Sequence, residues 1–222
     1  MKPFLYCLLS CAICNAAWAD VQIEFKDLTG TSTITSNARK VRIDGGKMPG
    51  YVLVDSASGE YFVVDSKRNE IIRAIPGEIV AVETAGGLNV SLKSTGDNEK
   101  IVGYSAGRFD LTVNGLHCGS LYGSSELMKN RDLRRMFEAM QGMHKLSRTL
   151  MAGMGGLLSE CQRAASRIAD LVDTGSFILR IIDDQGGLMF EVLTLDTDKQ
   201  VANSHYDLPP GMKIIDIDEK MR

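Results

Sequence analysis

The sequence has little that would suit it to nucleic acid, to carbohydrate stacking or to crossing a membrane as a mature chain. Its 25 Lys and Arg are outnumbered by 28 Asp and Glu, whereas phosphate binding needs clustered cations. Its single tryptophan, Trp18, falls in a segment that we expect to be removed, so the favoured platform for sugar stacking is missing. No later run is as apolar as a membrane-spanning helix of roughly 20 residues. We therefore expect no nucleic-acid partner and no transmembrane segment in the mature chain.

The N-terminus has the pattern of a secretory signal. Residues 1–19 contain a cation, a short apolar stretch and a small-residue cleavage site (Lys2, Phe4 to Ala12, and Ala17-Trp18-Ala19). We expect cleavage between Ala19 and Asp20, which leaves residues 20–222 as a single-domain protein in the periplasm or outside the cell. The segment that ends at Cys11 is also similar to a lipoprotein processing site, so a lipid-anchored chain stays an alternative.

Cysteine is scarce once the signal is removed. Three of the five cysteines leave with it, and Cys118 and Cys161 remain. An even number of cysteines in an oxidising compartment favours a disulfide. Neither residue is part of a C-x-x-C motif, which argues against a redox-active or metal-binding pair. We predict a Cys118–Cys161 disulfide.

Short β-runs separated by turn residues dominate the first half of the mature chain. Val21 to Phe25 alternates apolar and polar residues, the period of a half-buried strand. Asn114-Gly115 is typical of a two-residue hairpin turn. Further strands are expected at residues 41–43, 51–54, 61–64, 71–74, 79–82, 88–92, 100–104, 109–113, 116–122, 177–182 and 188–195, with weaker ones at 201–206 and 212–217. Consecutive hairpins indicate an antiparallel meander.

The pattern changes to a helical period between about residues 124 and 173. Ser124 or Ser125 can cap the first helix, whose apolar residues recur at helical spacing (133, 136, 137, 140, 143 and 150). Glycines at 153, 155 and 156 interrupt it, and a second helix is expected over 158–172. A glycine at 142 would add to the mobility of this segment. The sequence therefore predicts a two-helix insertion that covers one face of the sheet.

Several local motifs, taken in order, resemble a family of small exported bacterial proteins of uncharacterised function, whose fold is similar to the lipoprotein carriers and receptors of the LolA/LolB type. The motifs span most of the mature chain (Lys40 to Asp44, Tyr51 to Asp55, Phe62 to Asp65, Lys100 to Tyr104, Phe109 to Gly115, Gly175 to Arg180, Phe190 to Leu195, and Tyr206 to Lys213). The resemblance implies an α+β fold with a strongly curved antiparallel sheet, an incomplete barrel, covered by helices. In the carriers the space between sheet and helices accepts acyl chains, and the family supplies no catalytic residues.

Methionines gather on one stripe of the helical segment. Thioether side chains adapt to irregular apolar surroundings, so we predict a lining for a hydrophobic or lipid-like ligand (Met136, Phe137, Met140, Met143, Leu150, Met151 and Met154). Two alternatives stay open. The stripe can be the face that packs on the sheet, or it can bind copper(I) through soft ligands, in which case His144 would join three of the methionines.

The sequence supplies no convincing catalytic or metal site. Gly103 to Gly107 matches the G-x-S-x-G nucleophile motif, but that motif needs a helix after the serine, and residues 108–113 alternate like a strand. The three histidines show no zinc-ligand spacing. We therefore expect a non-enzymatic protein without a cofactor, which binds an acyl chain or a lipoprotein. The alternative is an envelope module that docks another protein and has no pocket.

Overall fold

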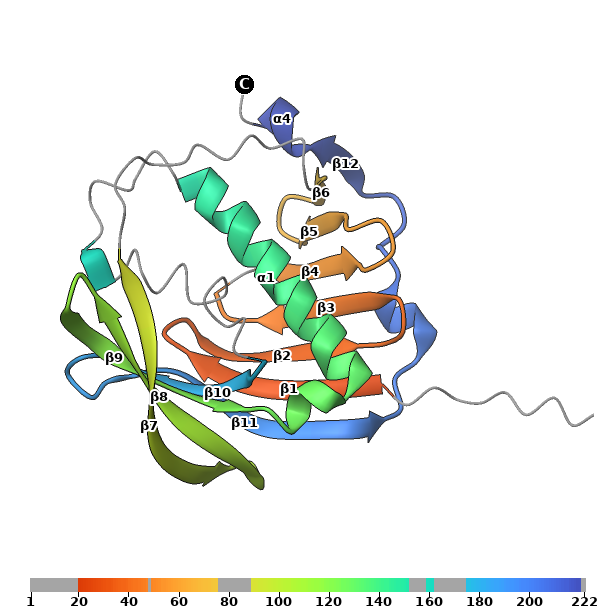
Figure 1. The fold of residues 1–222 in the computed structure, drawn as a ribbon. Helices are drawn as coiled ribbons and strands as arrows, with labels where there is room; N and C mark the ends of the chain where they lie inside the picture. Colours follow the sequence, from red (N-terminus) through yellow and green to blue (C-terminus); the bar gives the residue numbers. More distant parts are fainter. Residues whose placement is uncertain (1–19, 48, 76–88, 152–158, 162–174, 221–222) are drawn as a thin grey trace, which may run out of the picture.

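A single large sheet forms most of the molecule (Figure 1). The computed structural model describes residues 20–47, 49–75, 89–151, 159–161 and 175–220, without the side chains of 144–151. The twelve strands follow the order β12-β6-β5-β4-β3-β2-β1-β11-β10-β9-β8-β7. Their bounds are β1 Asp20–Asp27, β2 Gly30–Ser36, β3 Lys40–Gly45, β4 Gly50–Asp55, β5 Tyr61–Asp65, β6 Glu70–Ala74, β7 Val90–Ile101, β8 Tyr104–Val113, β9 Leu116–Ser124, β10 Phe177–Ile182, β11 Leu188–Lys199 and β12 Lys213–Asp216.

Hairpins build the sheet because turn residues separate runs of alternating apolar residues. From β1 to β6 each strand pairs antiparallel with the next. The predicted Asn114-Gly115 turn between β8 and β9 is confirmed, with positive φ at both residues (51° and 84°), as a two-residue hairpin of this type requires. β1 also pairs with β11, which joins the first strands of the described chain to the last ones.

One long helix, α1 (Arg131–Met151), lies across the concave face of the sheet (Figure 1). The Asn130 side chain caps it, because its Oδ1 accepts the backbone N–H groups of Asp132 and Leu133 at 2.9 and 3.2 Å. The helix therefore begins later than Ser124, which is the last residue of β9. Between them lies the short 3-10 helix η1 (Leu127–Lys129).

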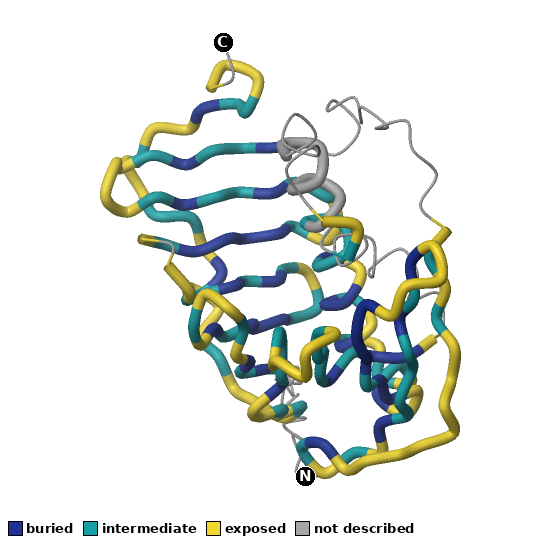
Figure 2. Tube along the Cα trace, turned by 90° about the vertical axis from the view of Figure 1, so that its left-hand side faces the viewer, coloured by how far each residue is buried: buried dark blue, intermediate teal, exposed yellow. Residues whose placement is uncertain are grey.

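Apolar side chains pack on both faces of the central strands, so the sheet separates two cores. The inner core lies under α1 and includes Val52 and Val54 of β4. The outer core includes Tyr51 and Leu53 of the same strand, covered by Tyr206 of η3 (Asn203–Tyr206). Figure 2 shows the buried residues running along the middle of the strands. β4 is therefore buried on both sides.

The predicted fold class is wrong in two respects. The sheet is mixed, because β12 runs parallel to β6. The described part of the chain is mostly sheet, and its fully described helices are α1 and the four-residue α4 (Ile217–Lys220), which conflicts with a two-helix insertion that covers one face. The sheet itself supplies part of the inner core, because β7 and β8 contribute Ile101 and Ala106 to it. The expected open, curved sheet agrees with the structure.

Three further predictions fall on residues outside the described ranges. These are the signal segment 1–19, the strand at 79–82 and nearly all of the second helix at 158–172. Within the described ranges, no helix has both the length and the hydropathy needed to cross a bilayer.

Candidate functional site

The predicted methionine stripe begins inside the inner core. Met136 is completely buried and Phe137 is 9% exposed. The Phe137 ring lies 6.1 Å from that of Phe177 on β10, in a tilted arrangement that is favourable for aromatic pairs. These two residues hold the first half of α1 against the sheet, so the packing alternative describes them well.

The helix and the sheet are in close contact at Gly142. The hydroxyl of Tyr61, on β5, donates a hydrogen bond to the backbone carbonyl of Ala139 at 3.4 Å. A Cβ placed on Gly142 would collide with that hydroxyl and come within 3.0 Å of the ring carbon Cζ. Small residues at 139 and 142 therefore allow α1 to lie directly on Tyr61, which is 5% exposed.

Beyond this contact the stripe reaches the surface. Met140 and Met143 are partly exposed and pack against the inner core, as do Val63 of β5 and Ile217 of α4. We name these four residues the apolar border. The last three predicted lining residues lie outside what the structure describes: Met154 wholly, and Leu150 and Met151 in their side chains. The structure thus brings Met140 and Met143 together at a half-buried margin between helix and sheet.

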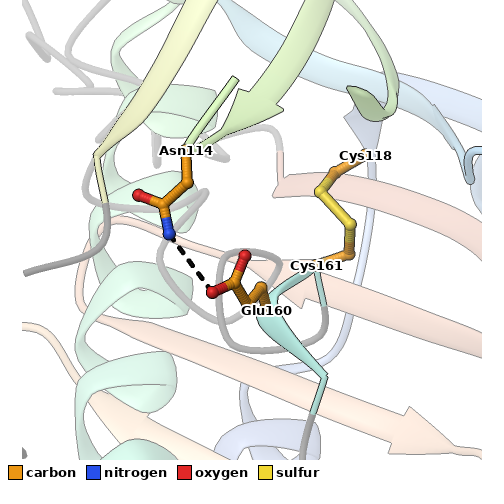
Figure 3. Close-up of a disulfide and its surroundings, with 4 residues drawn as sticks. All are labelled: Asn114, Cys118, Glu160 and Cys161. Atoms are coloured by element: carbon orange, nitrogen blue, oxygen red, sulfur yellow. Dashed lines mark hydrogen bonds between the residues drawn. A yellow bond between two sulfur atoms is a disulfide. The ribbon is translucent and has the colours of Figure 1, made fainter. Parts of the chain in front are cut away.

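The predicted disulfide is confirmed. Cys118 on β9 bonds to Cys161, and the two Cα atoms lie 5.2 Å apart (Figure 3). Beside it, the Asn114 side-chain amide donates a hydrogen bond to the Glu160 carboxylate at 3.2 Å (Figure 3). Because α1 lies between the two cysteines in the sequence, the disulfide closes a loop that contains the whole helix.

A polar cluster on the outer face was not predicted. We name it the clasp: Asp20, Arg42, Tyr51, His205 and Tyr206. The Arg42 guanidinium lies 3.6 Å from the centre of the Tyr51 ring and donates to the His205 carbonyl at 2.6 Å. The same guanidinium binds the carboxylate of Asp44, a neighbour of the clasp, at 2.7 Å. The Tyr51 hydroxyl donates to the carbonyl of Asp207, which follows η3, at 3.1 Å. These bonds fix η3 on strands β3 and β4.

The innermost contact of the clasp joins the two ends of the described chain. The Tyr206 hydroxyl donates to Oδ2 of Asp20 at 3.1 Å, and both residues are at most 5% exposed. Burial raises the pKa of the Asp20 carboxyl, and it also raises that of Tyr206. Burial and the nearby Arg42 lower the pKa of His205, so the neutral imidazole is favoured.

The clasp has only a partial signal in the sequence. The motif from Tyr206 to Gly211 enters as part of a family resemblance, and the pattern of residues 201–206 predicts a weak strand. Instead the segment turns as η3 and places its tyrosine ring on the outer core. Charged residues that alternate with apolar ones along β3 are compatible with any solvated face, so nothing indicates which of them would bind the C-terminal segment.

The serine of the G-x-S-x-G match has the surroundings of a strand. Ser105 is exposed in β8 and pairs with Lys100 of β7, and β8 continues to Val113 without the helix that a nucleophile elbow needs. No group of three or more His, Cys, Asp or Glu that could hold a metal ion occurs in the described part of the chain.

No protein-family model and no curated protein sequence matches this chain. The structure of PNGF-II is similar with a TM-score of 0.45 and 12% identity over 91% of this chain, which spans 32% of that one. An uncharacterized conserved protein from Thermus thermophilus gives a TM-score of 0.43 and 9% identity over 90% of this chain and 91% of that one. MucB, which has also been crystallised in complex with MucA(peri), gives a TM-score of 0.37 and 12% identity over 90% of this chain and 60% of that one. Similarity at this level does not establish a shared family, so function has to be argued from the chain's own residues.

Proposed function

We propose that this chain is an exported, non-enzymatic binding protein that holds a hydrophobic or lipid-like ligand at the apolar border between α1 and the sheet. The observation that carries the proposal is the partial exposure of Met140 and Met143 next to the inner core. Export to the periplasm or beyond rests on the signal pattern of residues 1–19.

The two halves of the stripe have different roles in this proposal. Met136 and Phe137 anchor the helix, so the ligand does not lie beneath its first half. The thioethers of Met140 and Met143 are free to change rotamer against an acyl chain, because they are unbranched and partly solvated. Each methylene buried there would contribute about 0.8 kcal/mol, so about ten fully buried methylenes correspond to the roughly 8 kcal/mol of micromolar affinity, before the entropic cost of association is subtracted.

Lipid analysis and direct binding test the proposal together. Mass spectrometry of the purified protein should detect a co-purifying lipid, and a fluorescent fatty acid should bind saturably. Met143→Gln places an amide against the ligand, which costs about 1 kcal/mol or more and should weaken binding roughly fivefold or more.

Met212→Gln is the matched control. Met212 is also partly buried, but it packs on the outer core, so its replacement should leave fatty-acid binding unchanged. A protein that carries no lipid and ignores the fluorescent fatty acid would refute the ligand proposal, as would equal weakening by both substitutions.

A second candidate, docking of an envelope protein, is favoured by one observation. β7 is twelve residues long and lies at one end of the strand order, and in the described part of the chain it pairs with β8 alone. Such an edge can accept a strand from a partner. A photo-crosslinker at the exposed Lys93 of β7 should then give a partner adduct, whereas one at the exposed Lys67, in the turn after β5, should not.

A further inference from the structure

Asp20 is a buried acid without an ion-pair partner among the described residues. It is the first residue of β1, and its side chain is 5% exposed. Within the described part of the chain, its carboxylate accepts a side-chain hydrogen bond from the neutral hydroxyl of Tyr206 at 3.1 Å. A buried carboxylate normally has a cation or several donors nearby, because losing its hydration is costly.

The charges that face Asp20 do not compensate it. His205 of η3 acts on it favourably only when protonated, and Asp132 of α1 acts on it unfavourably. Arg135 of α1 binds Asp132 at 2.9 Å, and Arg42 of the clasp binds Asp44 at 2.7 Å. On the neighbouring strand β11, the register partner of Asp20 is Lys199, but no ion pair joins these two described side chains. Asp20 therefore lacks a counter-charge from the described residues while it is an internal residue of the chain.

We propose that removal of the signal segment supplies this counter-charge: the new α-ammonium of Asp20 pairs with the Asp20 carboxylate and so stabilises the clasp. Hydrolysis by an envelope peptidase adds one water to the Ala19–Asp20 bond. Ala19 leaves with the new carboxylate, and the nitrogen of Asp20 becomes an amine that takes up a proton at neutral pH. The predicted cleavage point would thus be a structural requirement of the folded protein as well as a processing site.

The geometry of a single residue makes this pairing unavoidable. The backbone nitrogen and the side-chain oxygens of Asp20 are separated by a few bonds, so they stay within about 5 Å of each other in every rotamer. An opposite charge at that range stabilises the ionised carboxylate. The same pair exists in the unfolded chain, where water screens it, so the buried site of the folded protein is what makes the pairing favour folding. One additional residue before Asp20 would return an uncharged amide to this position and move the ammonium away.

The test uses the full-length gene with its own signal. One glycine is inserted between Ala19 and Asp20, which keeps the A-x-A pattern intact, and the exported proteins are purified. Intact mass should show that the unmodified chain begins at Asp20. The insertion should lower the urea midpoint at pH 7 and raise the NMR-measured pKa of Asp20 by about one unit, a tenfold change in ionisation constant.

Asp20→Asn provides the control, with and without the insertion. Without the carboxylate, the extra glycine should leave the urea midpoint unchanged. In the unmodified chain, the stabilisation by the α-ammonium should be fully present below the ordinary α-amino pKa of about 7.7 to 8.0. It should disappear as the pH rises through the pKa that the α-amino group has in the folded protein. An exported chain that begins elsewhere overturns the proposal. The proposal also fails if the inserted glycine does not change the urea midpoint of the chain that keeps Asp20. It fails too if the insertion changes the midpoint equally with and without Asp20→Asn. All of these readouts are independent of ligand binding.

Discussion

Replacing Gly142 with alanine should destabilise the protein, although the same change in most helices is favourable. Alanine is better than glycine in a helix interior by about 1 kcal/mol. Here the added methyl would collide with the Tyr61 hydroxyl and lie 3.0 Å from Cζ. Because Tyr61 is buried and hydrogen-bonded to Ala139, its ring has little room to move, and overpacking of this kind costs about 1–3 kcal/mol. We expect a net loss of about 1 kcal/mol in the free energy of unfolding.

A double-mutant cycle tests the reason for that loss. Tyr61→Phe removes the hydroxyl, so Gly142→Ala should cost about 1 kcal/mol less in the Tyr61→Phe chain than in the unmodified one, measured by urea unfolding. Gly107→Ala is a control, since its nearest neighbour would be 3.6 Å from the new Cβ. The reasoning fails if Gly142→Ala stabilises the unmodified protein, or if its effect is the same with and without the hydroxyl.

Three other predictions concern the clasp and the disulfide. Tyr206→Phe leaves the buried Asp20 carboxylate without its donor and should lower the free energy of unfolding by about 1–3 kcal/mol in urea; an unchanged urea midpoint would refute the importance of this bond. Burial and Arg42 lower the pKa of His205 in the folded state, so stability should fall as the pH drops below the unfolded value of about 6.5. Subtracting the pH profile of His205→Gln isolates this contribution, and identical profiles would contradict it. Replacing both disulfide cysteines with alanine opens a loop with a sequence separation of 43. This should lower the free energy of unfolding by about 4 kcal/mol on the chain-entropy model and so lower the thermal midpoint. An unchanged thermal midpoint would exclude this contribution.

The sequence predicts those parts of the fold in which local pattern and burial agree. The alternation from Val21 to Phe25 corresponds to β1, whose apolar residues are all at most 8% exposed. The Asn114-Gly115 turn is predictable because few other residue pairs adopt positive φ at two consecutive positions. The disulfide is predictable from the even number of cysteines that remain after the expected signal segment.

Other elements are missed because burial and hydropathy disagree there. β2 has the sequence GTSTITS, yet Ser32, Thr35 and Ser36 are buried, so small hydroxyl residues fill positions that a hydropathy pattern assigns to loops. The pattern of β7 predicts two separate runs, because Ser94 to Lys100 are polar and exposed. The structure has one strand there with a bulge opposite Arg108. This strand ends at Ile101, so a turn at Val102 and Gly103 divides the predicted run 100–104, and Tyr104 begins β8.

The binding stripe and the C-terminal segment depend on tertiary contacts that spacing alone does not encode. Helical spacing places Met136 and Met143 on one stripe. How much of the sheet lies against each residue decides that Met136 is buried in the core and that Met143 is partly exposed. The sequence predicts mobility at Gly142, whereas the structure places this residue so close to Tyr61 that a Cβ would collide with the tyrosine hydroxyl. The parallel β12 results from a connection across the outer face, which an antiparallel meander does not predict.

The Asp20–Tyr206 contact also limits when the molecule can fold. Its two residues are 186 positions apart, and β1, near the middle of the sheet, pairs with β11 from the end of the chain. The sheet cannot complete its central ladder before nearly all residues are available, and contacts between such distant positions form slowly. A chain with this topology cannot close its β1–β11 ladder until its last strands are available, so the hairpins from β1 to β6 can form before the sheet is complete.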